Sequence, residues 1–310
     1  MPALDPAVLD PALGAKVWVD LAGPTEAELS VLTDVFHFHP LAVEDAIAAV
    51  HHPKIENYDN YLYLILHGID YQRSRDEESF ITHDTDFFLG LNYLVTVHDG
   101  QTRSISGIQE VCGRSDHVLG EGPAALMHRI IDRMVDNYRP EIDQLEKWLD
   151  ELEIEVFEVP RKETLREILS VKHDVTALRR IATPQRDAIG RLARREFPNI
   201  SEELAYRFRD VYDNLVRIAD EALIFQDRIT SLLDAHYSNV SNRLNEIMRV
   251  LTVLTVIVAP LTLVAGIYGM NMHLPGVQTE NDPRPFWWLM GGMAATVVVM
   301  LAFFKKRNWL

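Results

Sequence analysis

Two long apolar runs without a charged residue constrain this chain more than any other feature of its sequence. One covers the 23 residues from Val250 to Met272, and the other covers the 19 residues from Phe286 to Phe304. A helix needs roughly 20 apolar residues to cross the hydrocarbon core of a bilayer. We therefore expect two membrane-spanning helices near the end of the chain. Everything before them mixes charged and apolar residues, which indicates a soluble N-terminal part.

Basic residues flank the two runs on one side of the expected membrane. They are Arg243, Arg249, Lys305, Lys306 and Arg307. The connecting loop, residues 273–285, has only Arg284 as a strong base. Cytoplasmic flanks carry an excess of Lys and Arg. We therefore expect a plasma-membrane protein whose long N-terminal part and short basic tail are cytoplasmic and whose loop faces outside.

Composition and motifs exclude several classes of function. The net charge is −16, from 46 acidic and 30 basic residues, whereas nucleic-acid binding needs a basic surface. The single cysteine, Cys112, cannot form an internal disulfide, which fits a reducing compartment. The histidines, including His37, His39 and His83, show no recognised catalytic spacing, and no P-loop is present. We expect no enzyme, no nucleotide cofactor and no nucleic-acid partner.

The remaining sequence predicts an α/β domain followed by long helices. The division is 1–120 for the α/β domain, 121–200 for a helical hairpin, 201–272 for a stalk helix continuing into the first span, 273–285 for the external loop, 286–304 for the second span and 305–310 for the tail. Strand-like runs are Ala15–Leu21, Tyr61–Tyr71 and Asp86–Asp99, the last a hairpin turning near Leu91 and Asn92.

Capping residues and prolines mark the expected helix ends. Thr25 with Glu28 fits a capping box, a short helix is expected after Pro40, and Ser201 can cap a later helix. Pro140 and Pro184 predict kinks or breaks in helices over Ala124–Glu158 and Glu163–Arg195. An unbroken helix from Glu203 to Ile267 would be roughly 97 Å long, about three times the hydrocarbon thickness.

The first span carries a stripe of small and polar residues at alternating steps of three and four. The stripe consists of Asn245, Met248, Thr252, Thr255, Ala259, Thr262, Gly266 and Gly269. Such a spacing keeps the residues on one face of a supercoiled helix. Helix packing explains such residues, and we favour it for the two glycines. For the threonines packing and pore lining stay open, and Asn245 on the same face favours a water-filled path.

Two helices cannot enclose a path for an ion. If the stripe lines one, several copies of the chain must surround it. The long stalk offers the surface on which copies can assemble. The transport hypothesis therefore includes an oligomer.

Several sequence motifs resemble the CorA family of magnesium transporters. The motifs are Tyr268-Gly269-Met270-Asn271 at the end of the first span, the tail Lys305-Lys306-Arg307-Asn308-Trp309-Leu310, the segments from Arg209 to Asp213 and from Asn245 to Thr252, His39-Pro40-Leu41 with Glu44-Asp45, and Pro184 with Arg186. The resemblance covers most of the chain and is strongest from Arg209 to Asn271.

The resemblance implies a funnel-shaped homopentamer in the lipid bilayer with a central pore lined by the first span. Asn271 and its symmetry mates would form the entrance ring, and Gly269 would let the chain bend toward the axis. Mg²⁺ dehydrates reluctantly, so neutral amides that hydrogen-bond its water shell suit a first selection step. The implied pore positions are Asn245, Met248, Leu251, Thr252, Thr255, Ala259, Thr262 and Gly266, of which Met248 and Leu251 form an apolar constriction.

The resemblance also implies regulation by internal Mg²⁺ held between cytoplasmic domains. Asp210 lies in the matching segment, and Asp70 and Asp76 are candidates for its partner. For Asp76 and Asp213 a solvated surface acid is the favoured interpretation. Transport of Mg²⁺, with Co²⁺ and Ni²⁺ as further substrates, would be driven by the membrane potential, which supplies about 4.6 kcal/mol per divalent ion at 100 mV.

Two alternatives to magnesium transport remain open. The loop has Leu274-Pro275-Gly276 and His273, with the acids Glu280 and Asp282 later, and is reminiscent of ZntB-type zinc transporters. Histidine favours Zn²⁺ over Mg²⁺. The second alternative is a membrane-anchored coiled-coil scaffold, which would conduct no ions.

Overall fold

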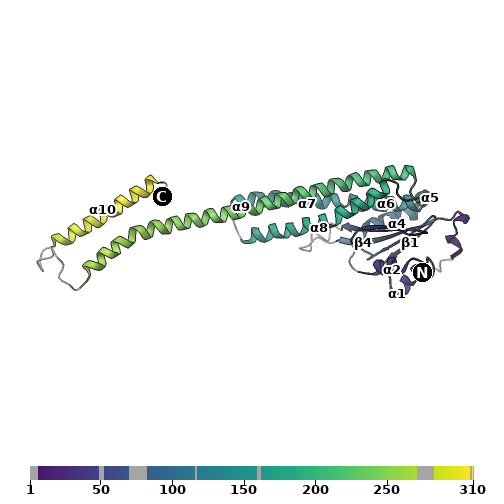
Figure 1. Ribbon diagram of the computed structural model, residues 1–310, viewed down its shortest axis with the longest axis horizontal. Coiled ribbons are helices and arrows are strands. Elements are labelled where there is room, and N and C mark those ends of the chain that lie inside the picture. The colour runs from purple at the N-terminus through teal and green to yellow at the C-terminus, as the bar shows by residue number, and fades with distance from the viewer. Residues whose placement is uncertain are drawn as a thin grey trace. The chain divides into compact units, whose positions relative to one another are not determined.

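The computed structural model describes residues 6–48, 52–69, 82–115, 117–158, 162–270, 283–307 and 309 (Figure 1). The chain forms two compact units, Met1–Leu233 and Asp234–Leu310. Helix α9, Glu202–Tyr268, contributes its first part to one unit and its remainder to the other. The α/β part, the long helix and the two apolar helices of the sequence-based prediction are therefore present.

A five-stranded mixed sheet forms the centre of the first unit. Its strands are β1 (Val17–Ala22), β2 (Lys54–Asn57), β3 (Leu62–Ile69), β4 (Thr82–Leu89) and β5 (Tyr93–His98). The strand order is β1-β5-β4-β3-β2, with β1 parallel to β5 and the other neighbours antiparallel. The three predicted strand regions are confirmed, whereas the four-residue edge strand β2 was not predicted.

The β4–β5 hairpin turns at the position that the sequence predicts. Strand β4 ends at Leu89, and strand β5 begins at Tyr93. A Cβ on Gly90 would lie 2.3 Å from the ring of Tyr93. Any larger residue would force the Tyr93 ring to move, because real Cβ atoms do not approach other atoms so closely.

Helices α1 (Glu26–Asp34) and α2 (Pro40–Ile47) cover one face of the sheet. The predicted capping box at the start of α1 is confirmed, since the backbone N–H of Thr25 donates to Glu28 Oε2 at 2.9 Å. The apolar core on this face is rich in aromatic rings. Phe38 stacks on Phe88 of β4 with 4.3 Å between ring centroids.

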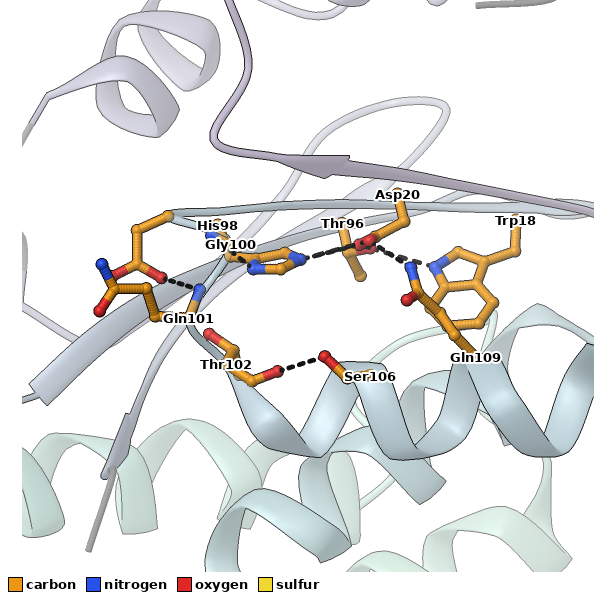
Figure 2. A network of polar contacts seen from close by, with 10 residues as sticks. Trp18, Asp20, Thr96, His98, Gly100, Gln101, Thr102, Ser106 and Gln109 are labelled. Carbon is orange, nitrogen blue, oxygen red and sulfur yellow. Dashed lines mark hydrogen bonds and ion pairs between the residues drawn. The ribbon is translucent and has the colours of Figure 1, made fainter. Parts of the chain in front are cut away.

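Helices α4 (Arg103–Arg114) and α6 (Pro123–Asp136) lie on the other face, with the short helix α5 (His117–Gly120) between them. Figure 2 shows the polar network that ties α4 to the sheet. Asp20 of β1 accepts hydrogen bonds from Thr96 Oγ1 and from Gln109 Nε2 of α4. His98 Nδ1 accepts from the Gly100 N–H at 3.1 Å, so its Nε2 is the nitrogen that donates to Asp20 at 3.2 Å.

Helices α7 (Tyr138–Glu158) and α8 (Lys162–Ala193) complete the first unit, together with the start of α9. The helix break expected at Pro140 lies instead at Asn137, because Pro140 sits in the first turn of α7, where a missing N–H costs no hydrogen bond. Helix α8 continues through Pro184, so the end considered there does not occur. The expected Ser201 cap is confirmed, since Leu204 N–H donates to its hydroxyl at 3.2 Å.

One buried glutamine completes the open edge of β3. In the described residues the pairing of β3 with β2 stops at Ile65, two positions before His67. Gln185 of α8 takes up the His67 backbone beyond this point, since its Oε1 accepts from the His67 N–H at 2.6 Å. The Tyr138 hydroxyl donates to the His67 carbonyl at 2.7 Å and accepts from Gln185 Nε2 at 2.9 Å. Both open backbone groups of His67 are thereby satisfied.

The second unit contains the end of α9 and helix α10, Arg284–Lys306. Both helices are long and apolar enough to cross a membrane. Only 6% of the most apolar window of α9 and none of that of α10 is buried within the structure. This exposure distinguishes them from core helices of a soluble protein, which bury their apolar residues.

Candidate ion pathway and cation-binding residues

The polar stripe forms one exposed face of the last part of α9. All eight residues from Asn245 to Gly269 that define it are exposed in the single chain. A second row of α9, Val253, Ile257, Pro260 and Val264, is buried or half-buried. At 3.6 residues per turn the two rows lie about half a turn apart. The stripe thus lies opposite the covered row, on the exposed surface of the helix.

The covered row of α9 has a counterpart on α10. Its less exposed residues are Pro285, Leu289, Met293, Val297, Met300 and Phe304. Steps of three and four place them on one face of that helix. We interpret the two rows as the faces that α9 and α10 turn toward each other within their compact unit.

The threonine hydroxyls of the stripe are all bonded back to their own helix. Thr252 Oγ1 donates to Met248 O at 2.7 Å, Thr255 Oγ1 to Leu251 O at 2.8 Å, and Thr262 Oγ1 to Val258 O at 2.9 Å. Each hydroxyl thereby uses its one hydrogen. The oxygen lone pairs remain as acceptors on the exposed face.

A shallow groove runs along the C-terminal half of this face. It has a volume of about 800 Å³. Its lining residues are Leu254, Thr255, Val258, Ala259, Thr262, Leu263, Gly266, Ile267 and Met270. Ala259 and Gly266 contribute little side-chain volume, which accounts for the depression along the stripe.

The structure follows α9 to its end but not to the asparagine of the Gly-Met-Asn motif. Helix α9 ends at Tyr268, and the N–H groups of Gly269 and Met270 still donate to Ala265 O and Ile267 O, at 2.9 and 3.3 Å. Asn271 and the loop acids Glu280 and Asp282 lie outside the described residues. Their roles therefore remain predictions.

Asp210 is exposed on the first part of α9 and has further carboxylates nearby on α6. Burial raises the pKa of Asp132; His128 opposes this shift, and the negative charges of Asp136 and Asp210 add to it. Sequence reasoning missed Asp132 and Asp136, although their spacing of four places both on one face of a helix. The predicted partners Asp70 and Asp76 lie outside the described residues.

The described part of the chain contains no group of three or more His, Cys, Asp or Glu residues placed to hold a metal ion by itself. Several histidines instead pair with single carboxylates. His67 Nδ1 lies 2.5 Å from Asp84 Oδ1, and His83 Nδ1 lies 2.5 Å from Asp99 Oδ2. A regulatory Mg²⁺ at Asp210 would therefore keep most of its water molecules as ligands or take further ligands from a second copy of the chain.

The basic tail follows the apolar part of α10 directly. Lys305, Lys306 and Arg307 are exposed. The N–H of Trp309 donates to Phe304 O at 3.0 Å, and the two rings stack with 5.8 Å between centroids. The end of α10 and the residues directly after it thus combine an aromatic pair with three positive charges, as is typical of a membrane interface.

Comparison with known sequences gives matches along nearly the whole chain. A family model described as CorA-like Mg²⁺ transporter protein matches residues 14–306. YfjQ of Bacillus subtilis, whose name refers to metal ion transport, is 32% identical over 296 residues, covering 95% of this chain and 90% of that protein. The cobalt/magnesium transport protein CorA of Thermotoga maritima is 31% identical over 300 residues, covering 94% and 83%.

Solved structures show the same fold. The complete CorA magnesium transporter from Methanocaldococcus jannaschii is similar with a TM-score of 0.82 at 23% identity, over 95% of this chain and 92% of that one. The cytoplasmic domain of ZntB from Vibrio parahaemolyticus gives a TM-score of 0.60 at 18% identity, over 74% and 89%. At these identities the likeness extends to the fold alone.

Proposed function

Because its residues 14–306 match the family model, this chain belongs to the family of CorA-like Mg²⁺ transporter proteins, and we propose that it conducts divalent cations, Mg²⁺ foremost, across a membrane. The stripe of α9 carries this proposal. It gathers polar and small residues on the face of α9 opposite its buried and half-buried row. The membership also agrees with the expectation that the chain is not an enzyme.

The proposed assembly is a homopentamer in the plasma membrane, with the stripes of five α9 helices around a central path. Residues 1–120 and 121–200 form its cytoplasmic part, 201–272 the stalk and inner span, 273–285 the external loop, 286–304 the outer span and 305–310 the cytoplasmic tail. Closed symmetric rings of identical subunits are the usual way to enclose such a path. The membrane potential is the proposed driving force.

The hydrogen-bonding state of the threonines suits a hydrated cation. Water molecules bound to Mg²⁺ point their hydrogens outward, and Mg²⁺ gives up these waters reluctantly. Hydroxyl oxygens whose own hydrogens are used inside the helix can accept from that shell. Thr252, Thr255 and Thr262 would thus guide the ion with its water attached. The exposed apolar side chains of Met248 and Leu251 would form a constriction that gates by dewetting.

Replacing Thr262 by valine should slow Mg²⁺ influx into proteoliposomes roughly two- to tenfold, because a lost hydrogen bond is worth about 0.5–1.5 kcal/mol. Thr296→Val is the matched control. Thr296 of α10 makes the same back-bond, to Gly292 O at 2.9 Å, but lies on the helix proposed to be outside the path. Its replacement should leave influx unchanged.

The same assay identifies the ion and tests the proposed function. Mg²⁺-sensitive and Zn²⁺-sensitive dyes would be used separately, with and without a pH gradient. Mg²⁺ influx that ignores the pH gradient supports the proposal. Zn²⁺ influx that requires the gradient would place the chain with zinc transporters. If folded protein admits neither ion, the membrane-anchored scaffold becomes the supported interpretation. Equal slowing by Thr262→Val and Thr296→Val would contradict the assignment of the stripe to the path.

We also propose that Asp210 takes part in closing the path when internal Mg²⁺ is high. Its charge lies close enough to affect Asp132, and a divalent cation relieves repulsion between carboxylates. Mg²⁺ loaded inside the vesicles should slow influx in the wild type by roughly fivefold or more, the lower range of typical coupling between sites. Asp210→Asn should remove this inhibition.

Asp213→Asn provides the control for Asp210. Asp213 is an exposed acid three residues further along α9, and the sequence favours a solvated role for it. Its replacement should leave inhibition intact. Inhibition that survives Asp210→Asn unchanged would show that regulation, if present, uses other residues.

A further inference from the structure

A buried carboxyl group in the sheet takes no part in the proposed ion path. Asp86 of β4 is only 6% exposed. Its strand neighbours, Ile65 of β3 and Val97 of β5, are apolar. Among the described residues its hydrogen-bond donor is the Tyr63 hydroxyl, which lies 2.5 Å from Asp86 Oδ1. A buried carboxylate without a cationic partner is costly.

Charged groups approach Asp86 from three of the elements around it. Asp84, two residues earlier on β4, is paired with His67 of β3. Asp45 comes from α2, and Lys54 with Glu56 from β2. Burial raises the pKa of Asp86 to about 7; the Tyr63 hydrogen bond and Lys54 act against this shift, while Asp84 and Asp45 add to it.

Asp86 can exchange a proton with solvent through a pocket. The pocket has a volume of about 300 Å³ and lies at the ends of β1 and β5 and the start of β4. Its polar lining includes Thr82, His83, Asp84, Asp86, His98 and Asp99, and the end of α2 closes one side. A proton leaving the Asp86 hydroxyl would pass to water in this pocket.

Lys54 connects the buried carboxyl group to α2. Its Nζ lies 5.6 Å from the ring centroid of Tyr63, the residue that donates to Asp86. The same ammonium group forms ion pairs with Asp45 of α2 and with Glu56 Oε1, the latter at 2.9 Å. Lys54 is thus paired with Asp45 while its positive charge also favours the ionised form of Asp86.

We propose that Asp86 is a proton-operated switch of the α/β part of the chain. With a proton bound, Asp86 is a neutral acid and leaves Lys54 paired with Asp45. When the O–H bond breaks and the proton passes to water, the Asp86 carboxylate draws Lys54 inward and weakens the tie between β2 and α2. The attachment of α2 thereby depends on cytoplasmic pH.

Difference infrared spectroscopy of the full-length protein, recorded between the acid and alkaline sides of pH 7, tests this directly. The wild type should show a carboxylic-acid carbonyl band that titrates with a midpoint near the value of about 7 given above. Asp86→Asn should lack that band. Persistence of the band in the variant would overturn the proposal. These spectra need no ion flux, so their outcome is independent of whether the chain conducts ions.

Two further variants test the geometry. Tyr63→Phe removes the hydrogen bond that favours the anion, so the midpoint should move to higher pH. Asp45→Asn removes a nearby negative charge and frees Lys54, so the midpoint should move to lower pH. If the titration midpoint is the same in Asp45→Asn as in the wild type, Asp86 and Asp45 do not compete for Lys54.

The pH dependence of stability should also depend on Asp86. Its pKa is raised in the folded state from an ordinary value of 3.8. Below about pH 4 the group is protonated in both states, so no penalty exists; the penalty grows as pH rises and is complete above the folded pKa. Relative to Asp86→Asn, the wild type should therefore lose free energy of unfolding between about pH 4 and about pH 7. The check is the thermal unfolding midpoint of both proteins at several pH values in this range. A difference between the two midpoints that does not change with pH would contradict the prediction.

Discussion

Replacing Asn271 by alanine should reduce Mg²⁺ influx into proteoliposomes by roughly 10- to 100-fold, the largest effect expected of any single change in this chain. In the proposed pentamer, Asn271 follows the end of α9 and its amide oxygen accepts hydrogen bonds from the water shell of the arriving ion. Hydrogen bonds to charged groups are worth about 1.5–3 kcal/mol, and each 1.4 kcal/mol corresponds to about tenfold. Alanine offers the polarised shell no acceptor.

Gln278→Ala is the control for this change. Gln278 is another neutral amide in the same external loop, and the proposal gives it no contact with the ion. Influx should be close to that of the wild type. If both variants lose activity, the loop needs its amides for folding, and if neither does, the entrance ring is elsewhere.

Replacing Gln185 by leucine should lower the free energy of unfolding by about 2–5 kcal/mol, because each buried polar group left unsatisfied costs about 1–3 kcal/mol. Gln185 is only 2% exposed. The variant leaves the His67 N–H without its acceptor and removes the donor to the Tyr138 hydroxyl. Thermal unfolding of the detergent-solubilised protein, followed by circular dichroism, should show a markedly lower midpoint.

Gln226→Leu tests whether any lost glutamine would have the same effect. Its Oε1 accepts from Arg179 Nη1 at 2.5 Å in an exposed position, where water can replace the partner. The change in stability should stay within about 0.5 kcal/mol. Equal destabilisation by the two variants would contradict the role of Gln185 as a substitute for a strand.

Local patterns predicted most of the secondary structure. The capping box at Thr25, the hairpin turn before Tyr93 and the two apolar runs each encode their own geometry, and the structure has the expected elements there. The helix end considered at Pro184 does not occur, because α8 continues through it from Lys162 to Ala193, whereas a kink there stays a prediction. The edge strand β2 escaped prediction because four residues give too short an alternation.

Of the candidate functional residues, sequence analysis could predict those that lie close together along one helix, but not those that only folding brings together. The stripe of α9 follows from its spacing, and the family resemblance that it supported is confirmed. The charge of Asp210, by contrast, affects Asp132 on a helix far away in the sequence, and no local sequence pattern predicts that proximity. The burial of Asp86 depends in the same way on which strands become its neighbours. Asn271 and the acids Asp70 and Asp76 stay predictions.

The back-bonded threonines would give the proposed path a sign preference without a single fixed charge. Water around an anion turns its oxygen outward and needs donors from the wall, but the hydroxyl hydrogens of Thr252, Thr255 and Thr262 are already engaged. Chloride would therefore find no partner where a hydrated cation finds several. Because no residue from Val250 to Ile267 is acidic or basic, this rejection would hold equally in acidified and alkaline surroundings.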